Sequence, residues 1–163
     1  MKAIFPGTFD PPTLGHLDLM ARMSEVCDFL YIALAVGHHK NPMFSLAERQ
    51  KMLELTAGEV LDRGRFQIVC FDSLLIDLCR DLGVNLILRG VRDGRDFEYE
   101  NRLFGVNHLL NSEIDTWYLP SRDQFSAISS EIAREVLRLD GEIEKILPAA
   151  VVSLIREKPL KQK

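Results

Sequence analysis

Five short apolar runs alternate along this chain with longer segments whose apolar residues recur at helical spacing, and this alternation restricts the fold most. The runs are largely continuous, as in strands that helices cover on both faces of a sheet. Strands and helices that alternate in this way are typical of an α/β protein with a parallel sheet. We therefore predict a single-domain, doubly wound five-stranded parallel sheet, with strands at residues 3–5, 29–36, 66–71, 85–88 and 116–119.

Helices are expected between these strands. The first begins near Gly15 and His16 and continues to Val26, and the second begins at Ser45, where Ser45 and Glu48 have the spacing of a capping box. Further helices are predicted at 75–82, at 97–110, after Ser129-Ser130 and at 149–156. No linker or repeat divides the chain, so we expect one domain over residues 1–157 and a loose basic tail at 158–163.

Composition narrows the classes of protein to which this chain can belong. A net charge of −4 over 163 residues argues against a nucleic-acid partner, which usually requires a basic face. No apolar run approaches the roughly 20 residues that span a bilayer, and the N-terminal apolar stretch is too short for a signal peptide. Cys27, Cys70 and Cys79 lack paired spacing and are expected to be buried thiols of a cytoplasmic protein.

Chemically distinctive residues follow the predicted strands. A parallel sheet binds ligands beyond the carboxyl ends of its strands, near the point at which the strand order reverses. The segments in question are 6–16, 37–40, 89–93, and 120–121 with 126–130. We expect these loops to converge on one cleft.

The first of these loops has the properties of a phosphate site. Gly7 allows the backbone to turn and to approach a ligand closely, and Thr8 offers a hydroxyl and a backbone N–H group. Gly15 and His16 then open a helix whose first N–H groups favour an anion. His16 is therefore predicted to touch a phosphate group.

Two short motifs make the chain similar to a known superfamily. Thr13-Leu14-Gly15-His16 resembles the first signature of the nucleotidyltransferases, which include cytidylyltransferases and nucleotide and pantetheine adenylyltransferases. Ile128-Ser129-Ser130 resembles their second signature, which contacts the nucleotide triphosphate. The resemblance implies a Rossmann-like nucleotidyltransferase fold and transfer of a nucleotidyl group.

A narrower resemblance covers essentially the whole chain. Residues 6–11, 40–44, 88–92 and 96–100 follow one another as in the bacterial phosphopantetheine adenylyltransferases. This implies transfer of AMP from ATP to 4′-phosphopantetheine, giving dephospho-coenzyme A and pyrophosphate, the penultimate step of coenzyme A biosynthesis. It also implies Mg²⁺ bound through the ATP phosphates, a homohexamer, and coenzyme A as a feedback inhibitor.

The same resemblance assigns residue roles. His16 would stabilise the transition state at the α-phosphate, and the catalytic set would be His16, Lys40 and Arg92. The acceptor site would consist of Thr8, Lys40, Leu75 and Arg89, although Leu75 is also a plausible core leucine. The ATP site would consist of Thr8, Phe9, His16, Gly90, Val91, Arg92, Glu100, Phe125, Ser126, Ala127, Ile128, Ser129, Ser130 and Glu131.

Several residues receive weaker assignments. His38 and His39 are expected to be solvated, and we predict no metal site made by the chain itself. The acidic residues of 96–100 are interpreted as a helix face that also meets neighbours. Glu131 stands where relatives often have a small hydroxyl residue, and we expect it to cap its helix.

Two alternatives stay open. A sister enzyme would use nicotinate mononucleotide, or a sugar or glycerol phosphate, as acceptor; Lys40, Arg89 and residues 96–100 favour pantetheine. A non-catalytic nucleotide sensor on the same fold could lose His16 or Lys40, and both are present. The acceptor phosphate is already ionised near neutral pH, so the predicted mechanism needs positioning and charge stabilisation rather than a general base.

Overall fold

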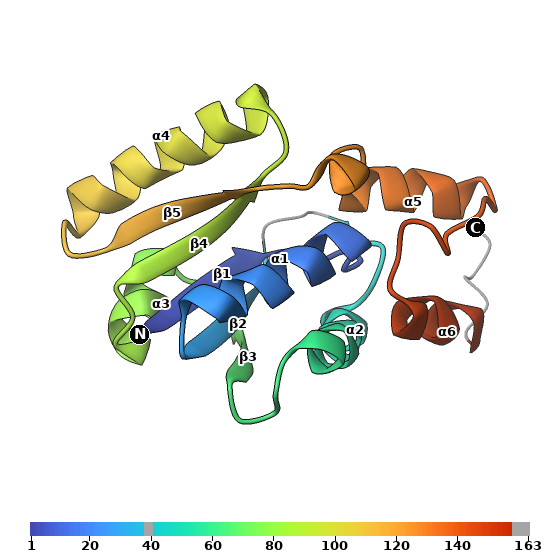
Figure 1. The fold of residues 1–163 in the computed structure, drawn as a ribbon, viewed down its shortest axis with the longest axis horizontal. Helices are drawn as coiled ribbons and strands as arrows, with labels where there is room; N and C mark the ends of the chain where they lie inside the picture. Colours follow the sequence, from blue (N-terminus) through green and yellow to red (C-terminus); the bar gives the residue numbers. More distant parts are fainter. Residues whose placement is uncertain (38–40, 158–163) are drawn as a thin grey trace.

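The computed structural model describes residues 1–37 and 41–157 (Figure 1). The predictions for His38, His39 and Lys40, and for the tail at 158–163, lie outside the described residues. None of the helices in the described ranges combines the length and hydropathy that a bilayer crossing requires.

Five strands form one parallel sheet, as the apolar runs predict. They are β1 (Lys2–Gly7), β2 (Phe29–Ala35), β3 (Phe66–Phe71), β4 (Leu86–Val91) and β5 (Asp115–Pro120). Their spatial order is β3-β2-β1-β4-β5, and every neighbouring pair is parallel. The chain therefore winds outward from β1 in one direction and then from β4 in the other, which is the doubly wound arrangement.

Helices cover both faces of this sheet (Figure 1). The helices are α1 (Leu14–Val26), α2 (Leu46–Val60), α3 (Leu75–Leu82), α4 (Gly94–Leu110), the short η1 (Asp123–Phe125), α5 (Ser130–Arg138) and α6 (Ala149–Glu157). The predicted capping box of α2 is confirmed: Ser45 Oγ accepts from the N–H of Glu48, and Glu48 Oε2 accepts from the N–H of Ser45. Gly83 ends α3 in the left-handed region, at φ 62°, which glycine adopts without strain.

The core has a separate apolar cluster on each face of the sheet. On one face, Leu19, Met20 and Met23 of α1 and Leu53 of α2 pack against alternate residues of the strands. On the other face, α3 packs Ile76 and Cys79 against the intervening strand residues. A third cluster joins α2 to α5 and α6 beyond the sheet. Cys27 and Cys79 are buried as expected, whereas Cys70 on the edge strand β3 is exposed, which contradicts the prediction.

The strand order reverses between β1 and β4, and these two strands are paired sparsely. β1 and β4 share one register pair, Ile4 with Ile87, whereas β1 and β2 share six. Pro6 of β1 has no N–H to donate to a neighbour, and its carbonyl oxygen accepts from the Arg89 side chain at 2.7 Å. The ladder between β1 and β4 is thus short at the point where the strand order reverses, which is where ligands bind in folds of this class.

Several boundaries differ from the sequence prediction by one or more residues, and two of these differences concern the cavity at the carboxyl ends of β1 and β4. β4 continues to Val91, so Arg89, Gly90 and Val91 lie in the strand rather than in the loop after it. α4 begins at Gly94, because Asp93 accepts from the N–H groups of Arg95 and Asp96 and so caps the helix early.

The helix α4, which the structure describes in full, has no buried residue. It lies against β4 and β5 (Figure 1). Large apolar side chains of α4 and β5 remain exposed: Phe97, Tyr99, Leu103, Val106, Leu109, Leu110 and Trp117. Among them, Val106, Leu109 and Leu110 lie in the carboxyl-terminal half of α4 and outside the lining of the main cavity, and we call these three residues the α4 apolar face.

Candidate active site

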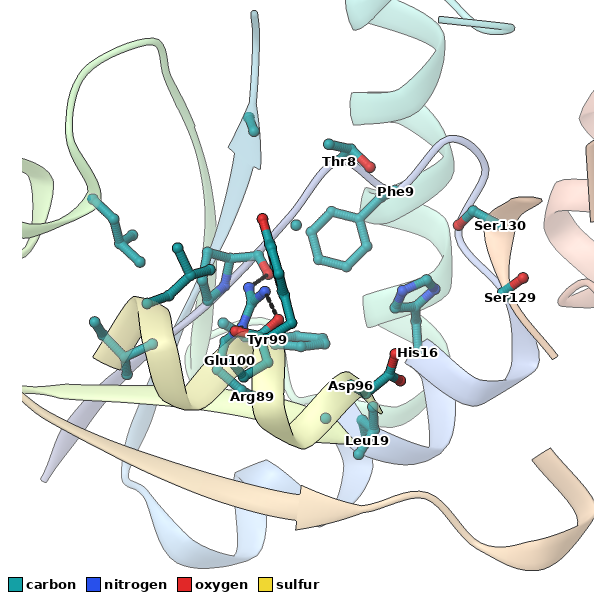
Figure 2. A pocket seen from close by; sticks show the side chains of 18 of the residues that line it. Thr8, Phe9, His16, Leu19, Arg89, Asp96, Tyr99, Glu100, Ser129 and Ser130 are labelled. Atoms are coloured by element: carbon teal, nitrogen blue, oxygen red, sulfur yellow. Dashed lines mark hydrogen bonds and ion pairs between the residues drawn. The ribbon is translucent and has the colours of Figure 1, made fainter. Parts of the chain in front are cut away.

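A cavity of about 750 Å³ opens at the carboxyl ends of β1 and β4. Its walls come from the loop after β1, the first turns of α1 and α5, the end of β4 and the inner side of α4 (Figure 2). The convergence of loops that the sequence predicts is confirmed for the segments after β1, β4 and β5, whereas Gly37 after β2 does not line the cavity.

The Thr13-x-Gly15-His16 motif builds the N-terminus of α1. Thr13 is the N-cap: its Oγ1 accepts from the N–H of His16 at 3.4 Å. In return, Nδ1 of His16 accepts from the N–H of Thr13 at 3.0 Å. A backbone N–H can only donate, so Nδ1 carries no proton and the neutral ring has its proton on Nε2. His16 thus offers an N–H donor to the cavity that it lines.

The surroundings of His16 keep its ring neutral. Burial, together with the positive charges of Arg92 and Arg89, lowers the pKa of His16 from 6.5 to about 4. Both effects disfavour the imidazolium form. At neutral pH the ring is therefore a hydrogen-bond donor without a charge of its own.

Phe9 fixes the loop in front of His16. Its φ is 46°, in the left-handed region, where a bulky residue is strained by an amount on the order of 1–3 kcal/mol. Its ring is buried and meets the rings of Phe5 and His16 edge to face, at centroid distances of 5.4 Å and 5.0 Å. A Cβ atom at Gly7 would come within 2.8 Å of this ring, so the position requires glycine.

Gly90 allows α1 to approach the sheet. A Cβ atom at this position would overlap Leu19 Cδ1. Leu19 lies one helical turn after His16, and Figure 2 shows both residues beside the cavity. Gly90 therefore sets the distance between β4 and the helix that carries His16.

The two arginines predicted to hold phosphates are each paired with a carboxylate of α4. Arg89 Nε donates to Glu100 Oε2 at 2.6 Å, and its Nη2 donates to Oε1 (Figure 2). Arg92 Nε and Nη2 donate to the two oxygens of Asp96 at 2.7 Å and 3.0 Å. These hydrogen bonds from Arg92 hold the pKa of Asp96 below its usual value. Asp96 and Glu100 both line the cavity, as the assignment of Glu100 to the ATP site predicts; Asp96 was interpreted only as part of a helix face that also meets neighbours.

The Ile128-Ser129-Ser130 motif builds the start of α5. Ser129 is the N-cap and accepts from the N–H of Ile132 at 3.1 Å. Ser130 Oγ donates to the carbonyl oxygen of Pro11 at 2.8 Å, which ties α5 to the first loop. The prediction that Glu131 caps this helix is wrong, because Ser129 does so and Glu131 lies in the first turn.

Most of the predicted site residues lie around the same cavity. Those that line it are Thr8, Phe9, His16, Leu75, Arg89, Gly90, Arg92, Glu100, Ile128, Ser129, Ser130 and Glu131. Val91, Phe125, Ser126 and Ala127 are not among the lining residues, and Lys40 lies outside the described residues. The assigned roles of all these residues remain predictions.

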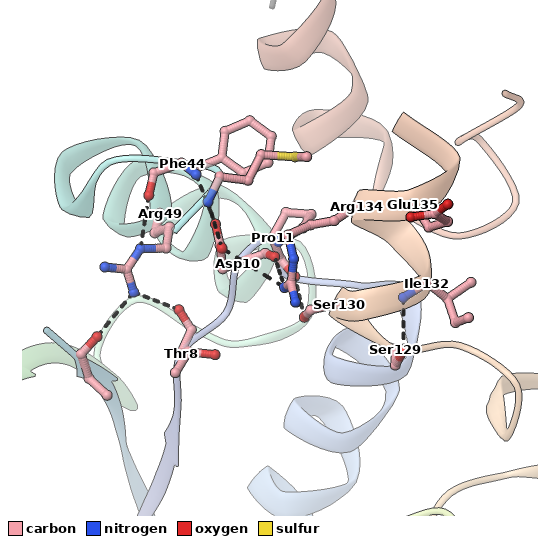
Figure 3. Close-up of polar contacts among 12 residues, drawn as sticks. Thr8, Asp10, Pro11, Phe44, Arg49, Ser129, Ser130, Ile132, Arg134 and Glu135 are labelled. Carbon is pink, nitrogen blue, oxygen red and sulfur yellow. Dashed lines mark hydrogen bonds and ion pairs between the residues drawn. The ribbon is translucent and has the colours of Figure 1, made fainter. Parts of the chain in front are cut away.

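Sequence reasoning missed a group of charged residues behind the first loop (Figure 3). Asp10 and Arg49 are buried, with exposed fractions of 1% and 3%, and Arg134 donates to the carbonyl oxygen of Asp10 at 2.7 Å. A signal existed for Arg49, which lies at helical spacing with the buried Met52 and Leu53 of α2. A cation on the buried side of a helix needs specific partners.

The sequence also missed part of the α4 wall. Tyr99, Leu103, Phe104 and Asn107 line the cavity together with Glu100. Their spacing of three or four residues would have placed them near one another on the helix. Within residues 1–37 and 41–157, no group of three or more His, Cys, Asp or Glu side chains could hold a metal ion.

Comparison with known proteins shows relatives along almost the whole chain. A family model described as Cytidylyltransferase-like matches residues 4–136. A phosphopantetheine adenylyltransferase from Dichelobacter nodosus is 40% identical over 154 residues, which is 94% of this chain and 94% of the relative. Another from Dinoroseobacter shibae is 41% identical over 150 residues, covering 91% of this chain and 88% of the relative.

Solved structures resemble the fold at low sequence identity. A Plasmodium falciparum nicotinic acid mononucleotide adenylyltransferase complexed with NaAD superposes with a TM-score of 0.71 and 14% identity. The superposition covers 96% of this chain and 94% of that chain. At this identity the likeness supports the nucleotidyltransferase fold alone.

Proposed function

This chain belongs to the phosphopantetheine adenylyltransferases, within the cytidylyltransferase-like family, and from that premise we propose that it transfers AMP from ATP to 4′-phosphopantetheine. The products are dephospho-coenzyme A and pyrophosphate, and the reaction is the penultimate step of coenzyme A biosynthesis.

One observation carries the mechanism: a neutral His16 whose Nδ1 accepts from the Thr13 N–H lines one cavity together with Arg89 and Arg92. The arrangement provides an N–H donor and two cations around one cavity. Such groups stabilise negative charge that develops in a transition state, and they need no reorganisation when the reaction occurs.

In the proposed step, an oxygen of the acceptor phosphate attacks the α-phosphorus of ATP. A new P–O bond forms, the bond from the α-phosphorus to the bridging oxygen breaks, and the electron pair leaves with pyrophosphate. No proton has to be removed from an ionised phosphate, so none of the residues serves as a general base. The protein holds both phosphates in line and offsets the charge that spreads over them.

The roles follow from position. Nε2 of His16 would donate to an α-phosphate oxygen, and Arg92 would offset charge on the nucleotide, whose triphosphate would meet the start of α5. Arg89 and Lys40 would hold the acceptor phosphate, with Thr8 between the two substrates. Leu75, which borders the cavity at the start of α3, would contact the pantetheine arm.

ATP would enter with Mg²⁺ bound to its phosphates. A small hard cation of this kind commonly takes phosphate oxygens and water as ligands. The arginine-rich mouth of the cavity fits such a complex, since it can take the phosphate oxygens that the ion leaves free. When bound, Mg²⁺ would neutralise part of the charge on the triphosphate.

We further propose that the protein assembles as a homohexamer in the cytoplasm. The α4 apolar face supports assembly, because exposed apolar surface of this kind marks protein contacts. Val106, Leu109 and Leu110 are 53%, 87% and 55% exposed in the single chain. Free thiols at Cys27, Cys70 and Cys79 agree with a reducing compartment.

Coenzyme A is the proposed feedback inhibitor. It contains both parts of the product, the pantetheine arm and the adenylyl group, and would compete for the same cavity. Isothermal titration of the protein with coenzyme A should give saturable binding that excess 4′-phosphopantetheine weakens. A flat titration would remove inhibition by coenzyme A from the proposal.

The experiment that tests the main proposal is pyrophosphate release from ATP and Mg²⁺ with a panel of acceptors. The panel contains 4′-phosphopantetheine, nicotinate mononucleotide and glycerol 3-phosphate, with CTP run beside ATP. Release with ATP and 4′-phosphopantetheine alone is the expected result. Release with another acceptor would replace the substrate, and binding of ATP without any release would favour a nucleotide sensor.

A further inference from the structure

Arg49 occupies an unusual position for a cation. It lies on α2, is 3% exposed, and within the described residues its hydrogen-bond acceptors are three main-chain carbonyl oxygens. Burying a guanidinium group is costly unless its N–H groups find acceptors. Packing alone does not explain a buried guanidinium at this position. The three carbonyl acceptors offset the cost of burying it.

The three carbonyl groups belong to separate segments that meet behind the cavity (Figure 3). Nη1 donates to Thr8 at 2.8 Å and to Ala35 at 3.0 Å, and Nε donates to Phe44 at 3.2 Å. Thr8 follows β1 and Ala35 ends β2, so one side chain joins the carboxyl ends of neighbouring strands to the entrance of α2. The planar guanidinium can do this because its N–H groups point in fixed, different directions.

The bond to Thr8 also sets the orientation of the peptide between Thr8 and Phe9. In a planar trans peptide the C=O and N–H groups point in opposite directions. Because the Thr8 carbonyl points at Arg49, the N–H of Phe9 points away from it. Phe9 holds a left-handed φ of 46°, which a bulky residue keeps only when its surroundings enforce it. The hydrogen bond from Arg49 to the Thr8 carbonyl holds this backbone conformation. The packing of the Phe9 ring against Phe5 and His16 holds it as well.

Asp10 completes the same framework. Its carboxylate is buried and accepts from the N–H groups of Met43 and Phe44 at 2.8 Å and 2.9 Å. Both main-chain polar groups of Phe44 are thus held, the N–H by Asp10 and the carbonyl by Arg49. Arg134 of α5 donates to the Asp10 carbonyl at 2.7 Å, which connects this framework to the second signature motif.

We propose that Arg49 is a positioning residue of the adenylyl transfer: it fixes the Thr8–Phe9 peptide, and with it the ring of Phe9 against His16, without touching either substrate. This role rests on the proposed function. Its loss should lower the turnover number more than the affinity for substrates, because the groups around the α-phosphate would be displaced while most binding contacts remain.

The test compares Arg49→Met and Arg49→Lys with Met52→Ala in the full-length protein. Met52 is also 3% exposed on α2, but it packs in the cluster with α5 and α6. The cluster also contains Phe44, but truncation of Met52 removes no acceptor of Arg49 and is expected to destabilise the same helix. Turnover, both KM values and the melting temperature are measured with ATP and 4′-phosphopantetheine, at a temperature at which every variant is folded.

Arg49→Met is expected to lower kcat by about 10²-fold, the scale of a misplacement of about 1 Å. Both KM values should change by no more than about threefold. Arg49→Lys should recover part of the loss, since one ammonium group can reach the Thr8 carbonyl but not all three acceptors. Met52→Ala should lower the melting temperature and leave kcat close to that of the parent.

Three results would overturn the role of Arg49: a kcat of Arg49→Met near the parent value, a loss confined to KM, or an equal loss of kcat in Met52→Ala at an equal melting temperature. These results leave the proposed function intact as long as the unmodified protein transfers AMP. Absence of transfer by the unmodified protein would overturn the proposed function and, with it, this role.

Discussion

Thr13 and His16 hold each other at the start of α1: the Thr13 hydroxyl caps the helix by accepting the His16 N–H, and the His16 ring accepts the Thr13 N–H. The reciprocal bonds explain why the two residues stand three positions apart. They also leave one tautomer of the ring, with its remaining N–H directed to the other side of the imidazole.

Replacing His16 with Ala should lower turnover by roughly 10²–10³-fold, the usual cost of losing one transition-state donor. Steady-state kinetics with saturating ATP and 4′-phosphopantetheine measure the loss. Glu25→Ala, at an exposed position of the same helix, is the control and should leave turnover unchanged. Turnover of His16→Ala near the parent value would contradict the proposal that His16 stabilises the transition state.

Acid should destabilise the protein through the same imidazole. The pKa of His16 is lowered in the fold from 6.5 to about 4, so between these values the unfolded chain binds more protons at this position than the folded protein does. The contribution of neutral His16 to the free energy of unfolding is complete above pH 6.5 and is lost as the pH falls toward about 4. Melting temperatures of the parent and of His16→Gln, compared from pH 8 to pH 5, should show the steeper fall in the parent. Parallel curves would contradict the lowered pKa.

Arg89 should contribute to binding of the acceptor more than to binding of ATP, and lysine should not be able to replace it. Its fork holds Glu100 and the Pro6 carbonyl at once, which a single ammonium group cannot reproduce. Arg89→Lys is expected to raise the acceptor KM by about tenfold, the equivalent of one charged hydrogen bond, and to raise the KM for ATP less. Arg80→Lys on α3, where the side chain is 61% exposed, is the matched control. An unchanged acceptor KM would contradict the proposal that Arg89 binds the acceptor phosphate.

Gly90→Ala should disturb the contact between β4 and α1. The new methyl group would overlap Leu19, and overpacking of this kind costs typically about 1–3 kcal/mol. Thermal unfolding should show the loss, together with reduced turnover, because His16 lies on the displaced helix. Adding Leu19→Ala should cost less than the sum of the two single changes. Gly58→Ala on α2 has no heavy atom near the added methyl group and should be neutral or stabilising.

The α4 apolar face should be an assembly surface. Val106→Glu places a charge on it and is expected to shift the protein toward smaller species, measured by size-exclusion chromatography with light scattering. Leu139→Glu is the control, because Leu139 is 74% exposed but lies after α5. An unchanged mass for Val106→Glu, or an equal shift in the control, would contradict assembly through α4.

The sequence predicts the architecture well because the strands are apolar and the helices carry local signals. The capping box at Ser45 and Glu48 and the glycine that ends α3 are recognisable within a few residues of the chain. β4 shows where local signals end. Its last residues, Arg89 to Val91, belong to the strand but lie beyond the apolar run. Arg89 and Gly90 border the cavity rather than a covered core, so the apolar pattern does not extend to them.

The site was predictable where a motif is local, and not where partners are distant in sequence. Thr13 and His16 are three residues apart, whereas Arg49 meets Thr8 across 41 residues and Arg134 meets Asp10 across 124. The pairing of Arg89 with Glu100 depends on how α4 packs against β4, which no spacing rule specifies. Such contacts become visible only when the fold brings the segments together.

Arg89 is paired with Glu100, and Arg92 with Asp96, so the guanidinium groups at the cavity are not unpaired cations. Under the proposed function, a phosphate that binds here would compete with a carboxylate anchored on α4 for the N–H groups of the arginine. Coulomb attraction grows with the product of the charges, so a dianionic monoester or a triphosphate competes better than a singly charged anion. In the proposed site, the internal carboxylates would therefore favour highly charged ligands and limit occupation of the cavity by the common monovalent anions of the surrounding solution.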